Sequence, residues 1–144
     1  MKILIKKLRP DAVIPASGSA YAAGYDLCAC IDAPLEIPPH TTAMVGTGLS
    51  MAVPEGWFGA IFARSGLATK QGLRPANCVG VCDSDYRGEY IIAIHNDSCE
   101  TRVVSPGDRI AQLVILPCGN AQFEEAETLS DTERSDGGFG STGV

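Results

Sequence analysis

The chain has 144 residues and a mass of 15.1 kDa, which suffices for one domain of ordinary size and is too little for two separate cores. Hydrophobic residues make up 45% and charged residues 19% of the sequence, a balance that excludes a wholly disordered chain. The net charge of −6 excludes a general polyanion-binding surface, and it is concentrated at one end: residues 1–119 hold ten basic and eleven acidic side chains, whereas residues 120–144 hold one and six.

Short apolar segments separated by Gly and Pro turns predict β-strands along most of the chain. Segments of this length that are rich in Val and Ile are typical of strands, and alternation places one face inward. The predicted strands, in chain order, are residues 3–8, 25–31, 49–53, 57–63, 76–82, 90–95 and 110–116. A helical pattern is limited to residues 65–70 and, to a lesser degree, 124–129. We therefore predict an all-β domain, a sandwich or jelly roll with one short helix.

Residues 120–144 differ from the rest in composition. They are acidic, with scattered apolar side chains, and end in the glycine-rich segment 134–143 (RSDGGFGSTG). So many glycines would lose much conformational entropy in a packed strand. Two interpretations stay open: a disordered tail, or a lid whose backbone N–H groups bind phosphate while its one aromatic ring covers a base. We accordingly predict a body at 1–119 and a C-terminal arm at 120–144 within a single domain.

The densest polar cluster of the body is residues 83–88 (DSDYRG), which directly follow an apolar segment. One interpretation is an Asx-type turn between two strands, with Gly88 resetting the chain direction. The other is a functional loop, in which Asp83 takes a proton from water as a general base and Tyr86 stacks on a sugar or a base. The two interpretations are compatible.

Arg64, Ser65 and Gly66 follow a predicted strand and open the predicted helix. Backbone N–H groups at a helix start, together with an arginine, would bind an anion. The alternative is ordinary N-capping by Ser65 beside a surface arginine. The pattern of a Walker A loop is missing here.

Polar residues within two predicted strands are further candidates. Asp26 either faces solvent or lies near a hydrated Mg²⁺, which usually takes one or two protein carboxylates plus substrate phosphates. Asp108 and Arg109 are adjacent and could simply pair with each other. Gln112 lies in mid-strand, where a polar side chain needs a partner.

The six cysteines and the absence of an apolar leader predict a cytoplasmic protein with free thiols. The apolar run near the N-terminus is too short for a signal peptide, and no segment approaches the roughly 20 apolar residues of a membrane span. We therefore expect no membrane partner. Without a Cys-x-x-Cys pair, zinc and redox sites are disfavoured, and we expect the thiols mainly to fill the core. The cysteines are Cys28, Cys30, Cys78, Cys82, Cys99 and Cys118.

Taken in order, five segments resemble the motifs of the trimeric dUTPase family. They are residues 23–27 (AGYDL), 64–68 (RSGLA), 77–88 (NCVGVCDSDYRG), 107–113 (GDRIAQL) and 134–143 (RSDGGFGSTG). They span nearly the whole chain at the family's usual spacings. Two departures are visible: Cys82 stands where the family more often has an aliphatic residue, and Ser135 where it often has glycine.

The resemblance implies a subunit that is a distorted jelly-roll β-barrel or sandwich with one short helix and an extended glycine-rich C-terminal arm. It also implies a homotrimer whose three active sites lie at subunit interfaces, with the arm crossing from one chain to another. The implied reaction is hydrolysis of dUTP to dUMP and pyrophosphate, with Mg²⁺ on the triphosphate. The reaction keeps uracil out of DNA and supplies dUMP for thymidylate synthesis. No nucleic acid is expected as a partner.

The resemblance also assigns roles at the base and sugar. Asp83 would activate the water that attacks the α-phosphorus and would bond the sugar 3′-OH. Tyr86 would pack beneath the deoxyribose and leave no space for a 2′-OH. Asn77 would read the uracil edge together with the backbone around three further residues, within a hairpin too tight for a 5-methyl group. These three are Val81, Cys82 and Ile91.

The remaining roles concern the triphosphate and the closing arm. Arg134 would clamp the γ-phosphate, Phe139 would cap the uracil, and Asp26 would act through water on the Mg²⁺ shell. Four other residues would hold phosphates. These are Arg64, Ser65, Gly66 and Gln112.

Two alternatives remain. A relative on the same fold, a dCTP deaminase, would release ammonia from dCTP, but the intact segment 134–143 and the hairpin sequence favour dUTPase. A regulatory protein that senses dUTP and binds a protein partner would need no hydrolysis, but the complete set of motifs weighs against it.

Overall fold

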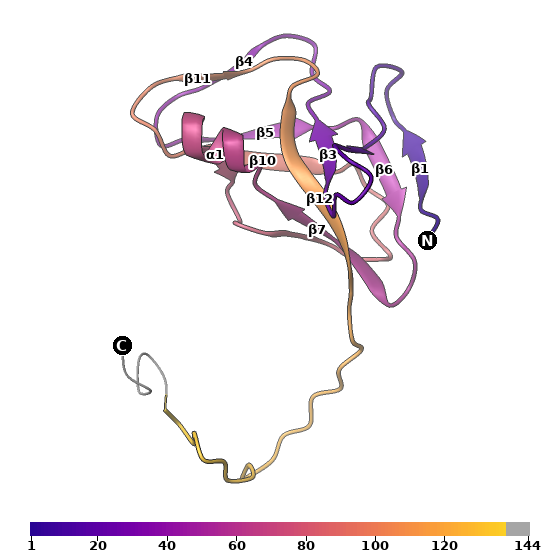
Figure 1. Cartoon of the computed structure of the whole chain (residues 1–144), viewed down its shortest axis with the longest axis vertical. Helices are drawn as coiled ribbons and strands as arrows, with labels where there is room; N and C mark the ends of the chain where they lie inside the picture. Colours follow the sequence, from indigo (N-terminus) through magenta and orange to yellow (C-terminus); the bar gives the residue numbers. More distant parts are fainter. Residues whose placement is uncertain (138–144) are drawn as a thin grey trace.

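The computed structural model describes residues 1–137, which form twelve β-strands and one short α-helix (Figure 1). The elements are β1 (Leu4–Lys7), β2 (Ala16–Ser17), β3 (Tyr25–Cys28), β4 (Leu35–Ile37), β5 (Thr42–Gly46), β6 (Leu49–Ala52), β7 (Trp57–Phe62), α1 (Ser65–Gln71), β8 (Leu73–Pro75), β9 (Gly80–Cys82), β10 (Ile91–Asn96), β11 (Arg102–Val104) and β12 (Arg109–Pro117). The predicted all-β class with one short helix is confirmed.

The strands form four sheets, and the largest has β12 at its centre. Its order is β2-β3-β12-β7-β9, with neighbouring strands antiparallel. A second sheet has the order β5-β10-β8, and two pairs, β1-β6 and β11-β4, complete the body. Within residues 1–137 these sheets do not close into a barrel, so the barrel form of the prediction is wrong and the jelly roll is an open, layered one.

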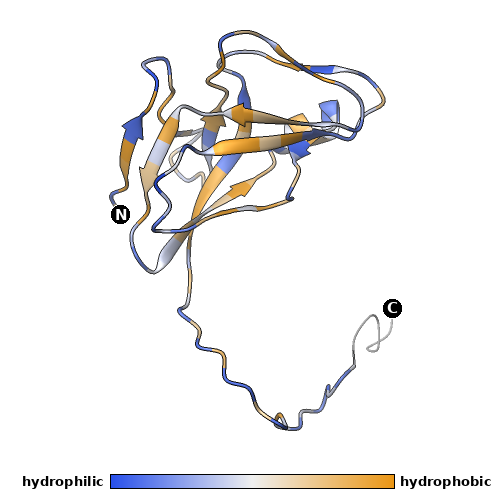
Figure 2. Cartoon of the chain, turned by 180° about the vertical axis from the view of Figure 1, so that it is seen from behind, coloured by the Kyte–Doolittle hydropathy of each residue, from blue (hydrophilic) through white to orange (hydrophobic). Residues whose placement is uncertain are grey.

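The core lies between the sheets and is built from side chains at alternate strand positions. Hydrophobic residues concentrate on the strands of the body in Figure 2. Leu27, Ile37 and Ile94 are completely buried, and the other buried members of the same continuous cluster are at most 5% exposed. Removing such a side chain from water stabilises the fold by about 1.5–3 kcal/mol.

Several strand boundaries differ from the sequence prediction. The segment 76–82, predicted as one strand, is broken: residues 76–79 form a turn, and only Gly80–Cys82 pairs, with β7. Cys78 has a φ of 60°, a left-handed conformation that a strand cannot contain. The short strands β2, β4, β5, β8 and β11 were not predicted, because two to five residues carry too little pattern. The candidate helix at 124–129 is wrong, since residues 118–137 contain neither helix nor strand.

The predicted helix at 65–70 is confirmed as α1, but its start differs in detail. Arg64, in extended conformation, is the N-cap and makes no side-chain capping bond, so Ser65 is the first helical residue and not the cap. Gly72 ends the helix with a φ of 68°, which glycine adopts without strain, and its N–H bonds to Ala68. Within the described part of the chain, no helix has the length and hydrophobicity to span a bilayer.

All six cysteines are free thiols, as predicted. Their expected role in the core is wrong for most of them. Cys30 alone is buried; Cys28 and Cys82 are partly exposed, and Cys78, Cys99 and Cys118 are exposed.

Candidate active site

The loops that flank β9 form the wall of a cavity of about 360 Å³. It brings together six of the residues predicted to bind substrate, and the acid predicted as the base is among them. Its lining residues are Met44, Ile61, Asn77, Gly80, Val81, Cys82, Asp83, Tyr86, Glu89, Tyr90 and Ile91. A single short stretch of chain, folded back on itself, thus supplies an amide, a carboxylate and an aromatic ring to one space.

Tight turns place the amide and the acid at the two ends of β9. The Val79 N–H donates to the Asn77 carbonyl at 2.6 Å. A Cβ on Gly80 would lie 3.1 Å from the Ile61 Cβ, which is a tight contact, and 3.4 Å from the Asn77 amide nitrogen, so glycine there lets β9 lie close to β7. At the other end, the Tyr86 N–H donates to the Asp83 carbonyl at 3.2 Å, which folds the loop that presents the carboxylate.

Tyr86 stands at the rim of the cavity in a defined orientation. Its hydroxyl donates to the Glu89 carbonyl at 2.9 Å, and its ring covers Gly88, where any Cβ would collide with the ring. The ring remains 44% exposed. An aromatic face held this way can support a sugar.

Cys82 lines the cavity, and burial raises the pKa of its thiol, so the thiol is neutral at physiological pH. The substitution of an aliphatic residue by cysteine therefore adds no charge to the cavity. The cysteine presents a small, weakly polar side chain to the cavity.

A second cluster joins β3, β12 and the N-cap of α1. The Asp26 carboxylate accepts from Arg64 Nε at 2.9 Å and from the Arg109 guanidinium at 3.2 Å. The Asp26 and Arg64 side chains are only 16% and 23% exposed, so the pair is partly shielded from water. Gln112 pairs with Asp26 in the β3–β12 ladder, and its side chain packs over Gly24. The pairing of Asp108 with Arg109 is wrong, because Arg109 binds Asp26 while Asp108 accepts from the Ser105 N–H at 2.7 Å.

Asp26 is already engaged by protein groups, with one carboxylate oxygen on each arginine. Within residues 1–137, no three His, Cys, Asp or Glu side chains are grouped as metal ligands. These residues do not fit a resident metal ion of the protein. The predicted contact of Asp26 with the Mg²⁺ shell through water stays a prediction.

Asp83 and the Arg64 cluster lie at opposite ends of β7, although the cavity itself extends along the strand to Ile61. Gly59 of β7 pairs with Cys82, directly before Asp83, whereas Arg64 follows the other end of the strand. Five residues of extended chain span about 16 Å. None of the four predicted phosphate ligands, Arg64, Ser65, Gly66 or Gln112, lines the cavity beside Asp83.

The last predicted residues lie in the tail, which leads away from the body after β12 (Figure 1). Arg134 Nε donates to the Gly137 carbonyl at 2.8 Å, and its side chain is exposed. Ser135 has a φ of 47°, in the left-handed region that favours glycine, which agrees with glycine being frequent at this motif position. Phe139 lies outside the described residues.

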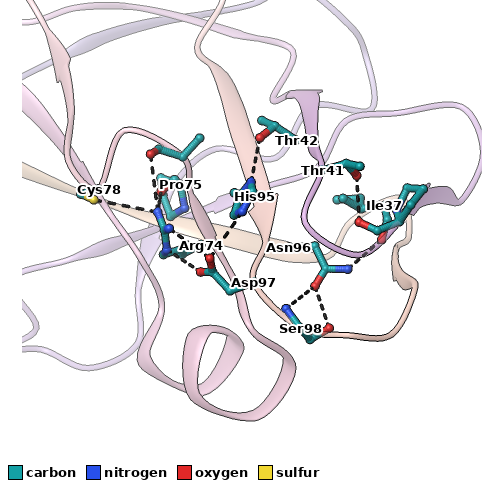
Figure 3. Close-up of polar contacts among 12 residues, drawn as sticks. Ile37, Thr41, Thr42, Arg74, Pro75, Cys78, His95, Asn96, Asp97 and Ser98 are labelled. Carbon is teal, nitrogen blue, oxygen red and sulfur yellow. Dashed lines mark hydrogen bonds and ion pairs between the residues drawn. The ribbon is translucent and has the colours of Figure 1, made fainter.

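A row of polar side chains crosses the sheet β5-β10-β8 and ends at the segment that carries Asn77 (Figure 3). Thr42 Oγ1 and His95 Nδ1 are 2.9 Å apart, and Asp97 is 3.4 Å from His95 Nε2. Asp97 accepts two bonds from Arg74, at 2.6 and 3.1 Å. Arg74 in turn donates to the Pro75 carbonyl at 3.1 Å. The row therefore ties the start of the Asn77 turn to the sheet.

We expect Asp97→Asn to lower the unfolding temperature at pH 7 by a few degrees at most, because the Arg74 pair is exposed. Hydrogen bonding by Arg74 holds the pKa of Asp97 below its ordinary value of 3.8, so folding favours the carboxylate. This stabilisation is present above pH 3.8 and is lost as the pH falls through the lowered pKa. Thermal unfolding between pH 2 and 7 should therefore show the two proteins converging in acid. A difference that grows in acid would contradict the assignment. Asp85→Asn, at an exposed carboxylate outside the ion pairs of residues 1–137, is the control.

Sequence reasoning missed several residues that belong to these clusters. Arg109 was assigned to the wrong partner, and four residues that line the cavity were given no role: Met44, Ile61, Glu89 and Tyr90. The apolar pattern of the following strand contains Tyr90 and marks it as a core residue, but no sequence signal places it beneath a cavity.

The fold and the cavity define an all-β protein that brings an amide, a carboxylate and an aromatic ring to one cavity. Comparison with known proteins narrows this class. The dUTPase family matches residues 11–143. Two relatives named deoxyuridine 5′-triphosphate nucleotidohydrolase are similar over nearly their whole length. That of Syntrophotalea carbinolica is 48% identical over 98% of this chain and 96% of its own, and that of Wolinella succinogenes 50% over 99% and 95%.

The structural comparison agrees. The Staphylococcus bacteriophage 80alpha dUTPase with dUPNHPP superposes with a TM-score of 0.87 at 28% identity, covering 99% of both chains. The chain belongs to the dUTPase family, as the motifs predicted.

Proposed function

We propose that this protein hydrolyses dUTP to dUMP and pyrophosphate, with the substrate bound as its Mg²⁺ complex. The observation that carries the proposal is the cavity in which Asn77, Asp83 and Tyr86 meet. Family membership supports it, as do the names of the relatives and the nucleotide in the phage structure.

In this proposal the cavity holds the base and the sugar. The Asn77 amide, which can both donate and accept, reads the uracil edge with the backbone of β9. Ile91, at the start of β10, closes the side of the cavity. Tyr86 lies beneath the deoxyribose and excludes a 2′-OH. The hairpin that carries β9 lies against the uracil edge and is too tight for a 5-methyl group.

Asp83 acts as the general base. The oxygen of a water molecule forms a new bond to the α-phosphorus, and its proton passes to the Asp83 carboxylate. The bond from the α-phosphorus to the bridging oxygen breaks, and the electron pair leaves with pyrophosphate. Most of the rate acceleration in such a reaction comes from positioning the substrate and neutralising its charge. The arginines supply the positive charge.

We also propose that the site is completed by other copies of the chain in a homotrimer. The separation of the Arg64 cluster from Asp83 along β7 supports this, because one chain does not bring its arginine cluster to its own cavity. Residues 120–144 would form an arm that carries Arg134 and Phe139 to a neighbouring cavity. We place the protein in the cytoplasm, which is consistent with six free thiols.

A panel of nucleotides with Mg²⁺, followed by pyrophosphate release, tests the proposed activity. We expect release from dUTP, with dTTP, dCTP and UTP near background, because the cavity excludes a 5-methyl group and a 2′-OH. Ammonia release from dCTP would instead indicate a deaminase. Binding of dUTP without hydrolysis, together with capture of a protein partner that depends on dUTP, would indicate a regulatory protein.

A further inference from the structure

Tyr90 lies behind the cavity and is the largest side chain among the completely buried residues. Only 1% of it is exposed. Its backbone is bound to the β5–β6 turn: the Tyr90 N–H donates to the Leu49 carbonyl at 2.8 Å. The Tyr90 carbonyl accepts from the Thr47 hydroxyl at 2.7 Å and from the Thr47 N–H at 3.2 Å. Thr47 is itself fully buried, so these hydrogen bonds fix the Tyr90 backbone in the core.

The Tyr90 ring is the aromatic neighbour of Tyr86. The ring centroids are 6.0 Å apart and the planes are tilted by 52°. This lies within the range in which aromatic pairs attract one another beyond the burial of their area. The Tyr86 side chain makes one hydrogen bond within the described residues, to the Glu89 carbonyl, and Tyr86 is 44% exposed. The tilt of Tyr86 at the cavity rim therefore depends on a ring that is anchored in the core.

We infer that Tyr90 is a positioning residue that sets the selectivity of the site for deoxyribose over ribose. Tyr90 does not touch the sugar itself and acts on it only by orienting Tyr86. The inference rests on the proposed function, because it assumes that Tyr86 lies beneath the sugar of the bound nucleotide. A ribose 2′-OH is excluded by contact with Tyr86, and this exclusion weakens when the Tyr86 ring can tilt away.

The ring of Tyr90, and not its hydroxyl, carries this role. The hydroxyl is buried and has no hydrogen-bond partner within the described chain. It lies beside Gly59, where a Cβ would be 3.5 Å from the hydroxyl oxygen and 3.5 Å from the Cys82 Cβ. Burial also raises the pKa of Tyr90, so the hydroxyl stays neutral. Tyr90→Phe therefore keeps the ring and removes only the hydroxyl.

The test compares kcat/KM for dUTP and UTP in variants of the full chain. We expect Tyr90→Leu to lower the dUTP/UTP ratio by about 3- to 10-fold, since the attraction between the rings is lost. Tyr90→Met, which fills more of the space, serves if the leucine variant folds poorly, and should shift the ratio in the same direction. Tyr90→Phe should leave the ratio unchanged.

A control elsewhere in the core, outside the cavity lining, separates a purely structural role of Tyr90 from a positioning role. Ile37→Ala removes an equally buried side chain in β4 and should lower the unfolding temperature without changing the ratio. An unchanged ratio in both ring-deleting variants, with a wild type that discriminates, overturns the inference. So does a Tyr90→Phe variant that loses discrimination. A wild type that does not hydrolyse dUTP would refute the proposed function itself, and the inference with it.

Discussion

Asp83→Asn lowers the turnover of dUTP by about 10²- to 10⁴-fold while nucleotide binding persists, because the amide cannot take the proton of the attacking water. Asp83 follows β9 at the edge of the cavity and is exposed, so the substitution leaves the core intact. Steady-state pyrophosphate release measures turnover. Equilibrium binding of a non-hydrolysable dUTP analogue measures affinity.

The control must remove the same charge elsewhere. Asp32→Asn does so at an exposed carboxylate that pairs with Arg9 at 2.6 Å, outside the cavity. We expect near-normal turnover for this variant, because no group of the cavity changes. Near-normal turnover in Asp83→Asn would show that another group deprotonates the water.

Deletion of residues 134–144 nearly abolishes turnover and leaves the body folded. The buried hydrophobic residues lie between positions 12 and 113, and β12 ends at Pro117, so the deletion removes nothing from the core. It does remove Arg134, the one basic residue of 120–144, and with it the proposed clamp on the γ-phosphate. Turnover, unfolding temperature and native mass should be measured together.

A single substitution separates the arginine from the rest of the arm. Arg134→Gln should lose most of the turnover, since a neutral amide cannot neutralise phosphate charge. Glu133→Gln changes the neighbouring charge and should retain turnover. Full activity of the truncated chain would falsify the role proposed for the arm. Loss of the native mass would show instead that these residues hold the assembly together.

The strands that were predicted well carry long apolar patterns of their own. Residues 57–63 and 110–116 correspond to β7 and β12, which occupy the interior of the largest sheet. In contrast, β4, β8 and β11 have three residues each and become strands only because a partner strand passes beside them. Local propensity carries no information about such partners.

In the candidate site, too, residues close together in the sequence were predicted and contacts between distant residues were missed. The motif around Asp83 predicted six lining residues of the cavity, because they lie within one hairpin and its next strand. The partner of Arg109 was missed, since Asp26 lies 83 positions away in the chain and meets it only through the pairing of β3 with β12. The role of the Tyr90 ring likewise depends on its tilt toward Tyr86.

The sequence alone determined the all-β class, the dUTPase motifs and the residues able to do chemistry, because these depend on residue type and local spacing. Only the tertiary structure decided how those residues are divided, with Asn77, Asp83 and Tyr86 in one cavity and Asp26 and Arg64 in a separate cluster outside it. Strand register causes this division, since it aligns residues that are distant in the sequence and is selected by the packing of the whole core.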